Sequence, residues 1–140
     1  MLKSSLSTKV HGFLYSVLLM SALNSPLAHA HAHLKKAEPA ENSVTAKLPE
    51  SVVLNFSEEL EGAMSKIEVR DLGSKKIISE GKATAGSAAD PNSLQIHLKP
   101  ETEMGTGKST STRQFEVSWK AVAKDTHSTK GSYKFKLERK

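Results

Sequence analysis

The fold is decided by residues 113–121, which read RQFEVSWKA. Apolar and polar side chains alternate along this stretch, a period of two that is typical of a strand with one buried face. Residues 133–137 repeat the alternation as YKFKL. These are the two strongest predicted strands, with Trp119 facing inward, and the motif DTH at residues 125–127 lies between them.

Five weaker segments of the same kind precede this pair. They are residues 34–37, 52–56, 67–69, 76–79 and 94–98. Turn-forming residues separate them, and residues 81–92, rich in Gly, Ala, Ser and Asp, are predicted to be a surface loop. His97 falls on the polar side of its segment. About seven short strands without a helical stripe predict an all-β sandwich.

The first 30 residues are predicted to be a signal peptide that is removed on export. Lys3 and Lys9 precede an apolar run at residues 13–23, and small residues follow at alternate positions. The apolar run is well short of the roughly 20 residues that span a bilayer, and no later segment is apolar enough to do so. We therefore expect one exported domain, residues 31–140, with no membrane span.

Two positions satisfy signal peptidase, which tests the residues one and three before the cut for small side chains. Cleavage after Ala30 leaves Ala28 and Ala30 at the tested positions and makes His31 the first residue. Cleavage after Ala32 would make His33 the first residue instead. We favour the cut after Ala30, because it keeps the polar segment behind the apolar run shorter.

Charge and cysteine content exclude two classes of function. The mature segment keeps 18 basic and 15 acidic residues, a net charge of +3, because the signal peptide holds two lysines and no acid. Its lysines are scattered along the sequence, a pattern that predicts no nucleic-acid binding. The chain has no cysteine, so thiol chemistry and cysteine-based zinc sites are excluded, and any metal site must use nitrogen and oxygen donors.

The histidines at the new N-terminus are candidate metal ligands. A free N-terminal His31 would offer an amine and an imidazole from one residue, and His33 a second imidazole. Asp125 and His127 stand two residues apart, and such residues point to the same side of an extended segment. Together these groups supply amine, imidazole and carboxylate donors, a set that suits Cu(II) in a tetragonal plane.

Three alternatives stay open. The histidines could be incidental to signal-peptide processing, and Asp125 could cap a turn through its own backbone. His33, at the third position after the favoured cut, also allows a square-planar set of the amine, two deprotonated amides and its own imidazole. That last arrangement would need no folded protein.

Short motifs extend from the predicted cleavage site almost to the C-terminus. They are HAHL at residues 31–34, EPA at 38–40, LNFSE at 54–58, VSWKAV at 117–122, DTH at 125–127 and GSYKF at 131–135. In combination they resemble the CopC (YobA-like) family of periplasmic copper-binding proteins. The resemblance implies a periplasmic, Ig-like Greek-key β-sandwich that binds one Cu(II) ion. The implied ligands are the amine and side chain of His31 with Asp125 and His127, and His33 matches a second histidine of members that begin His-x-His.

Two departures from the family pattern are visible. Residues 101–114 form a polar loop several residues longer than the short Pro-x-x-Gly-x-Tyr turn usual in the family, with Phe115 where Tyr is common. The family pattern therefore does not fix where the next strand begins. The chain also has no methionine-rich loop of the kind with which some members bind Cu(I), because only Met64 and Met104 remain after the signal peptide. Soft donors select Cu(I), so we expect Cu(I) to bind poorly.

The resemblance favours a non-enzymatic role in copper carriage, buffering or resistance, with delivery to a CopD-like inner-membrane copper transporter. A histidine-brace copper redox enzyme, similar to lytic polysaccharide monooxygenases, is one alternative. Against it, 110 residues leave little room for a flat substrate surface, and Trp119 and the phenylalanines are predicted to lie in the core. A metal-free, Ig-like structural module is another alternative, and it predicts that the processed protein binds no copper.

Overall fold

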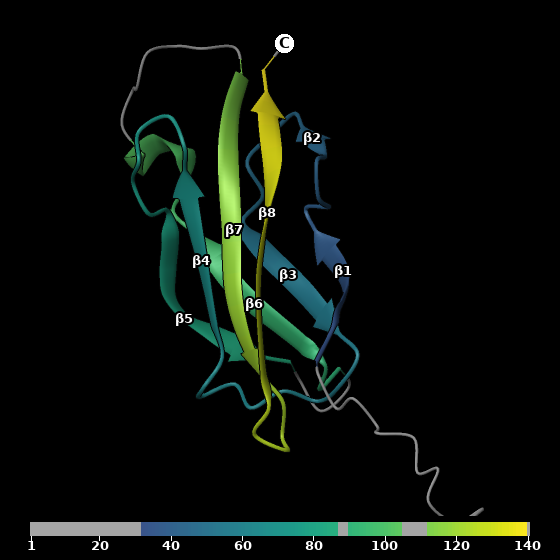
Figure 1. The fold of residues 1–140 in the computed structure, drawn as a ribbon. Coiled ribbons are helices and arrows are strands. Elements are labelled where there is room, and N and C mark those ends of the chain that lie inside the picture. Colours follow the sequence, from purple (N-terminus) through teal and green to yellow (C-terminus); the bar gives the residue numbers. More distant parts are fainter. Residues whose placement is uncertain (1–31, 87–89, 105–111, 140) are drawn as a thin grey trace, which may run out of the picture.

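The computed structural model describes residues 32–86, 90–104 and 112–139. The strands are β1 (Leu34–Glu38), β2 (Val44–Thr45), β3 (Ser51–Phe56), β4 (Lys66–Asp71), β5 (Ser79–Ala85), β6 (Ser93–Leu98), β7 (Thr112–Val122) and β8 (Ser128–Glu138), and a short 3-10 helix, η2, spans Glu101–Glu103 (Figure 1). The predicted signal peptide and His31 lie outside the described residues. Within the described ranges, no helix is long and apolar enough to cross a membrane.

The strands form two four-stranded sheets that face each other (Figure 1). The first sheet has the order β1-β3-β6-β5, and the second has the order β2-β8-β7-β4. Neighbouring strands are antiparallel except β2 and β8, which are parallel. Strands that follow one another in sequence often lie in different sheets, as in a Greek-key sandwich. The predicted all-β sandwich is confirmed, with eight strands in the described ranges.

The core lies between the sheets and is built from the alternating apolar side chains that predicted the strands. The rings of Phe115 and Phe135 stack there with centroids 5.1 Å apart. Trp119 packs half-buried against the core, 6.4 Å from the ring of Phe56. Gly131 lies opposite it, and a Cβ atom there would come within 2.3 Å of the indole Cζ2. The missing side chain at Gly131 therefore makes room for the inward-facing tryptophan.

The two strongest predicted strands, β7 and β8, form a long hairpin in the second sheet. They pair without a register shift from Thr112 opposite Glu138 to Val122 opposite Ser128. β4 lies on the other side of β7 and pairs with residues 115–120 of that strand. Residues 123–127 therefore form the tip of this hairpin, at one end of the sandwich.

The prediction for residues 76–79 is only partly right. This segment is expected to be the strand partner of residues 67–69. In the structure, the N–H of Ile78 donates to the carbonyl of Val69 at 2.8 Å. At Ser79 the chain crosses to the first sheet and begins β5, which pairs with β6. The contact with β4 is therefore short.

The loop predicted for residues 81–92 is wrong over its first part, where β5 continues to Ala85 along β6. The register of this pair shifts between Glu80 and Thr84. Gly81 lies within the shift with a φ of +74°, which favours glycine. The inward positions of β5 carry alanines, whose small side chains give little hydrophobic signal, so the alternation of apolar residues does not reveal this strand.

The long loop predicted at residues 101–114 begins with η2. Met104, the residue after this helix, is buried in the core. β7 begins at Thr112, one residue before the expected strand. Residues 105–111 of the loop lie outside the described residues.

Candidate metal centre

Main-chain hydrogen bonds close the tip of the β7–β8 hairpin. The N–H of Ala123 donates to the carbonyl of His127, and the N–H of Thr126 donates to the carbonyl of Ala123, both at 2.9 Å. Thr126 has a φ of 76°, a left-handed conformation that is uncommon for a β-branched residue. The tip therefore carries Asp125 and His127 on either side of one strained residue.

Asp125 and His127 contact each other through two polar interactions. Oδ2 of Asp125 lies 3.0 Å from Nδ1 of His127, and Oδ1 accepts the main-chain N–H of His127 at 3.1 Å. The main-chain bond and the imidazole hold the pKa of Asp125 below its ordinary value, so the carboxylate is charged at neutral pH. The structure thus brings the two side chains together. It also gives Asp125 the turn-capping bond that the sequence left open.

The chain directly after His31 is fixed beside this hairpin. Ala32 is buried, and its carbonyl accepts the hydroxyl hydrogen of Thr129 at 2.7 Å. At His33, the N–H donates to Oγ of Ser57 at 2.9 Å and the carbonyl accepts the N–H of Ser57 at 2.8 Å. Thr129 follows His127 by two residues, so the N-terminal segment enters at the same end of the sandwich as the hairpin tip (Figure 1).

The donors gathered in the described residues do not make a complete site. Among residues 32–86, 90–104 and 112–139, no three His, Asp or Glu side chains are grouped closely enough to hold a metal ion. Asp125 and His127 form a pair, while the exposed His33 is held through its main chain on Ser57. His31 lies outside the described residues, next to the anchored Ala32. A complete site at this end would therefore need donors from the extreme N-terminus.

The residues that fix the N-terminal segment were not found from the sequence. Ser57 belongs to the motif LNFSE, but nothing in the pattern indicates that it bonds both main-chain groups of His33. Thr129 is one of many threonines in the chain, and its partner Ala32 is 97 residues away in sequence. Contacts of this kind depend on the sheet order and leave no local signal.

In a comparison with protein families, the CopC domain family matches residues 34–138. The chain belongs to the CopC family. One CopC relative is Protein YobA of Escherichia coli strain K12, which is 30% identical over 121 residues, or 86% of this chain and 90% of YobA. Another is Copper resistance protein C of Escherichia coli, which is 33% identical over 115 residues, or 79% of this chain and 84% of that protein.

Solved CopC-family structures have a similar fold. The match to CopC from Methylosinus trichosporium OB3b has a TM-score of 0.64 at 24% identity, and covers 78% of this chain and 95% of that chain. The match to PcoC, a methionine-rich copper resistance protein from Escherichia coli, has a TM-score of 0.60 at 31% identity. It covers 78% of this chain and all, 100%, of PcoC. Both likenesses agree with the two-sheet sandwich.

Proposed function

We propose that this CopC-family protein is an exported, periplasmic Cu(II)-binding protein that serves copper resistance by carrying or buffering the ion. Cleavage after Ala30 frees His31, whose amine and imidazole bind one Cu(II) ion together with Asp125 and His127. His33 is a further candidate ligand at the same end. The bound ion is the protein's cargo, and a CopD-like inner-membrane transporter is the proposed recipient.

The observation that carries this proposal is the anchoring of Ala32 by Thr129. The bond of 2.7 Å fixes the residue after His31 to the strand that starts beside the hairpin tip. His127 and Asp125 already lie together at the tip, with Oδ2 of Asp125 3.0 Å from Nδ1 of His127. A ligand set drawn from both the N-terminus and the tip therefore depends on the folded sandwich.

The donor chemistry supports Cu(II) over Cu(I). Amine, imidazole and carboxylate groups suit Cu(II), whereas thioether sulfur is what selects Cu(I). Of the two methionines outside the signal peptide, Met104 is buried in the core and Met64 is exposed on a loop. The relative PcoC is described as methionine-rich, but this chain has only four methionines in all.

The placement of the aromatic side chains supports a binding role rather than action on a polysaccharide. Phe56, Phe115, Tyr133 and Phe135 are buried, and Trp119 packs against them. The described residues therefore present no exposed aromatic platform for a sugar chain. Two of the similar proteins, Copper resistance protein C and PcoC of Escherichia coli, are named for copper resistance.

The proposal is tested by comparing melting temperatures with and without Cu(II) for Asp125→Ala and His127→Ala. A bound ligand stabilises the native state by about 4 kcal/mol when its free concentration is about a thousandfold above Kd. We expect both variants to fold without metal but to lose much of the copper-dependent rise. Binding should also weaken below about pH 6, as protons compete for the imidazoles and the amine.

His97→Ala is the matched control, because His97 is an exposed histidine on β6 of the first sheet. It should keep the full copper-dependent rise. If Asp125→Ala and His127→Ala also keep the full rise, the hairpin tip is not part of the site and the N-terminal peptide alone binds the metal.

A further inference from the structure

Three lysines form a straight row across the outer face of the second sheet. Lys66 of β4 lies directly opposite Lys120 of β7, and Lys120 lies directly opposite Lys130 of β8. Their neighbours in sequence, among them the buried Ile67 and Ala121, face the core, so the three lysines face outward. We call these residues the lysine row. The sequence scatters them over 65 positions, and only the sheet order brings them together.

The lysine row is unfavourable for the isolated protein. Like charges directly opposite each other on neighbouring strands destabilise a sheet. In the described part of the chain no ion pair involves these lysines, whereas nearby Arg70 pairs with Glu68 at 2.8 Å and Lys124 pairs with Glu61 at 3.3 Å. The charge of the row is therefore left for something outside the chain.

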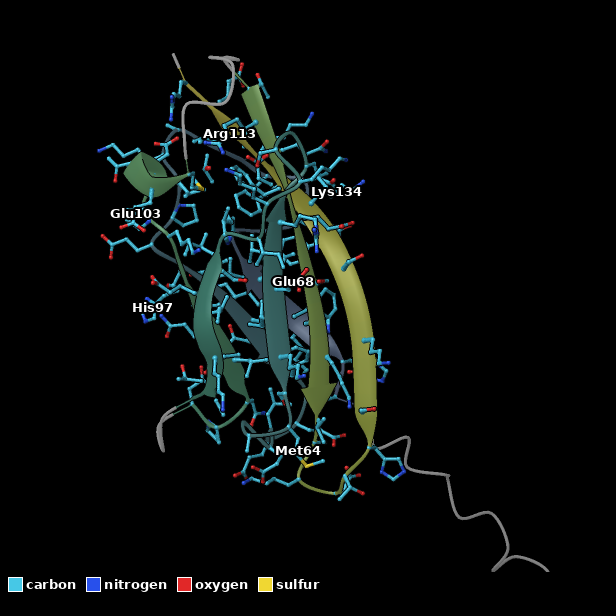
Figure 2. All side chains as sticks on the ribbon, turned by 90° about the vertical axis from the view of Figure 1, so that its left-hand side faces the viewer. Met64, Glu68, His97, Glu103, Arg113 and Lys134 are labelled. Carbon is cyan, nitrogen blue, oxygen red and sulfur yellow. The ribbon has the colours of Figure 1, made fainter. Side chains whose placement is uncertain are left out.

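The outer face around the row carries both charges, and a groove lies beside the row. Lys134 and Lys136 continue along β8 on this face, and Glu116 of β7 lies directly opposite Lys134. Figure 2 labels Lys134 on β8 and the acidic Glu68 on β4. Beside the row, a groove of about 1060 Å³ lies between β4, β5 and β7. Its lining includes Lys66, Lys82 and Lys120 together with Ile67, Ala83 and Trp119. Glu68 also lines it and is paired with Arg70. The groove thus combines a basic rim with apolar side chains.

The row lies close to the hairpin tip. Lys120 comes two residues before Val122, where β7 ends, and Lys130 comes three residues after His127. A partner that covers the row therefore sits next to Asp125 and His127. The acidic residues Glu59 and Glu61 of the loop before β4 pair with Lys124. They therefore pair with a lysine outside the row and leave the charge of the row in place.

We propose that the lysine row, with Lys82 across the groove, docks an acidic surface of a partner protein. That this docking serves copper transfer rests on the proposed function; the docking itself does not. The row spans two strand spacings, about 10 Å, which is short for a nucleic-acid track, and the groove offers apolar contact that a protein side chain fills. Complementary charge of this kind steers association and sets the orientation of the partner.

The test uses the mature chain without copper and a fluorescent, short poly-glutamate peptide as the acidic probe. The row variant Lys66→Gln, Lys120→Gln and Lys130→Gln is compared with a control variant, Lys47→Gln, Lys75→Gln and Lys76→Gln. Both lose three charges from exposed or half-buried lysines. We expect the row variant to bind the peptide roughly tenfold more weakly, because three ion pairs of small individual strength are lost together. The affinity of the control variant for the peptide should change by less than about twofold.

Two further measurements separate the outcomes. The row variant should melt at the same or a higher temperature, because like-charge repulsion is removed, so weaker binding would not reflect unfolding. Equal loss of peptide binding in both variants would overturn the proposal, since net charge alone would explain it. It is also overturned if the row variant loses binding to phosphatidylglycerol vesicles while its peptide binding matches the control, which would indicate a membrane surface. Failure of the parent chain to bind copper would affect only the proposed function.

Discussion

Asp71 is a buried carboxylate at the end of β4, far along the strand from the hairpin tip. It accepts hydrogen bonds from Arg113 at 2.5 Å, from the hydroxyl of Ser74 and from the N–H of Gly73, both at 2.9 Å. Burial acts to raise the pKa of Asp71, but these hydrogen bonds and the charge of Arg113 outweigh it and hold the pKa below its ordinary value. The charged form is therefore the one that stabilises the fold.

We predict that Asp71→Asn lowers the free energy of unfolding at pH 7 by about 2 kcal/mol, because it leaves the mostly buried Arg113 without its main partner. A carboxyl group with a lowered folded-state pKa contributes stability above its unfolded-state pKa and loses it as pH falls. The parent should therefore lose stability below about pH 4, and the variant should lose less over the same range. Urea unfolding at several pH values measures both effects.

The matched control is Glu68→Gln, since Glu68 also pairs with an arginine, Arg70, but at the exposed surface. Exposed pairs contribute about 0–1 kcal/mol, so this variant should stay close to the parent at every pH. Equal effects of the two substitutions would mean that burial of Asp71 adds nothing.

At the scale of single residues, the spacing of two side chains predicted that they lie together but not what else they bond to. The two-residue separation of Asp125 and His127 correctly indicated that their side chains would lie together. The same spacing could not show that Asp125 also caps the turn, because that depends on the left-handed conformation of Thr126. The roles of His31, His33, Asp125 and His127 as metal ligands all remain predictions.

At the scale of elements, the hydroxyl of Thr129 links β8 to the N-terminal segment. We predict that Thr129→Val weakens Cu(II) binding by the mature chain, because the valine keeps the shape but loses the bond to Ala32 that positions the residue after His31. One neutral hydrogen bond contributes about 1 kcal/mol, so the Kd should rise roughly fivefold to tenfold. A competition titration against a copper-binding dye measures it.

Thr45→Val controls for the loss of a threonine hydroxyl as such. Thr45 of β2 donates to the carbonyl of Lys136 at 3.2 Å, toward the opposite end of β8 from the hairpin tip. This variant should bind copper as the parent does. Equal copper affinity of Thr129→Val and the parent would show that the anchor does not position a ligand.

Elements with strong alternation were predicted well, and those without it were not. β3, β6, β7 and β8 each bury every second side chain over most of their length, and the sequence indicated all four. The sequence did not predict β5, because it is an edge strand whose inward residues are alanines and whose register shifts near Gly81. The sequence did not predict β2 either, because this strand has only two residues and its parallel pairing with β8 depends on the tertiary fold.

At the scale of the whole molecule, the sequence predicted two layers but not what their outer faces carry. In sequence order the three lysines stand far apart and form no pattern. The antiparallel registers of β4, β7 and β8 place Lys66, Lys120 and Lys130 in one line. Such a surface pattern depends on the register between strands, so it cannot be predicted before the strand pairing is known.

The central claim is that the free N-terminus and the folded sandwich together bind one Cu(II) ion. Two contacts support this claim: the hydrogen bond that anchors Ala32 to Thr129, and the contact between Asp125 and His127. An N-terminal peptide that binds copper alone, through its amine, two amides and His33, would need neither contact. A peptide beginning His31-Ala32-His33 should therefore bind Cu(II) more weakly than the protein and with a different spectrum.

The most direct measurement is a Cu(II) titration of the mature chain that begins at His31, beside the same chain preceded by one extra methionine. The extra residue removes the amine of His31 from the chelate and leaves every described contact of the sandwich in place. We predict a stoichiometry of one ion for the mature chain and an affinity at least about 100-fold lower for the extended chain, since even second-shell losses reach that size. Equal affinity of the two chains would contradict the account.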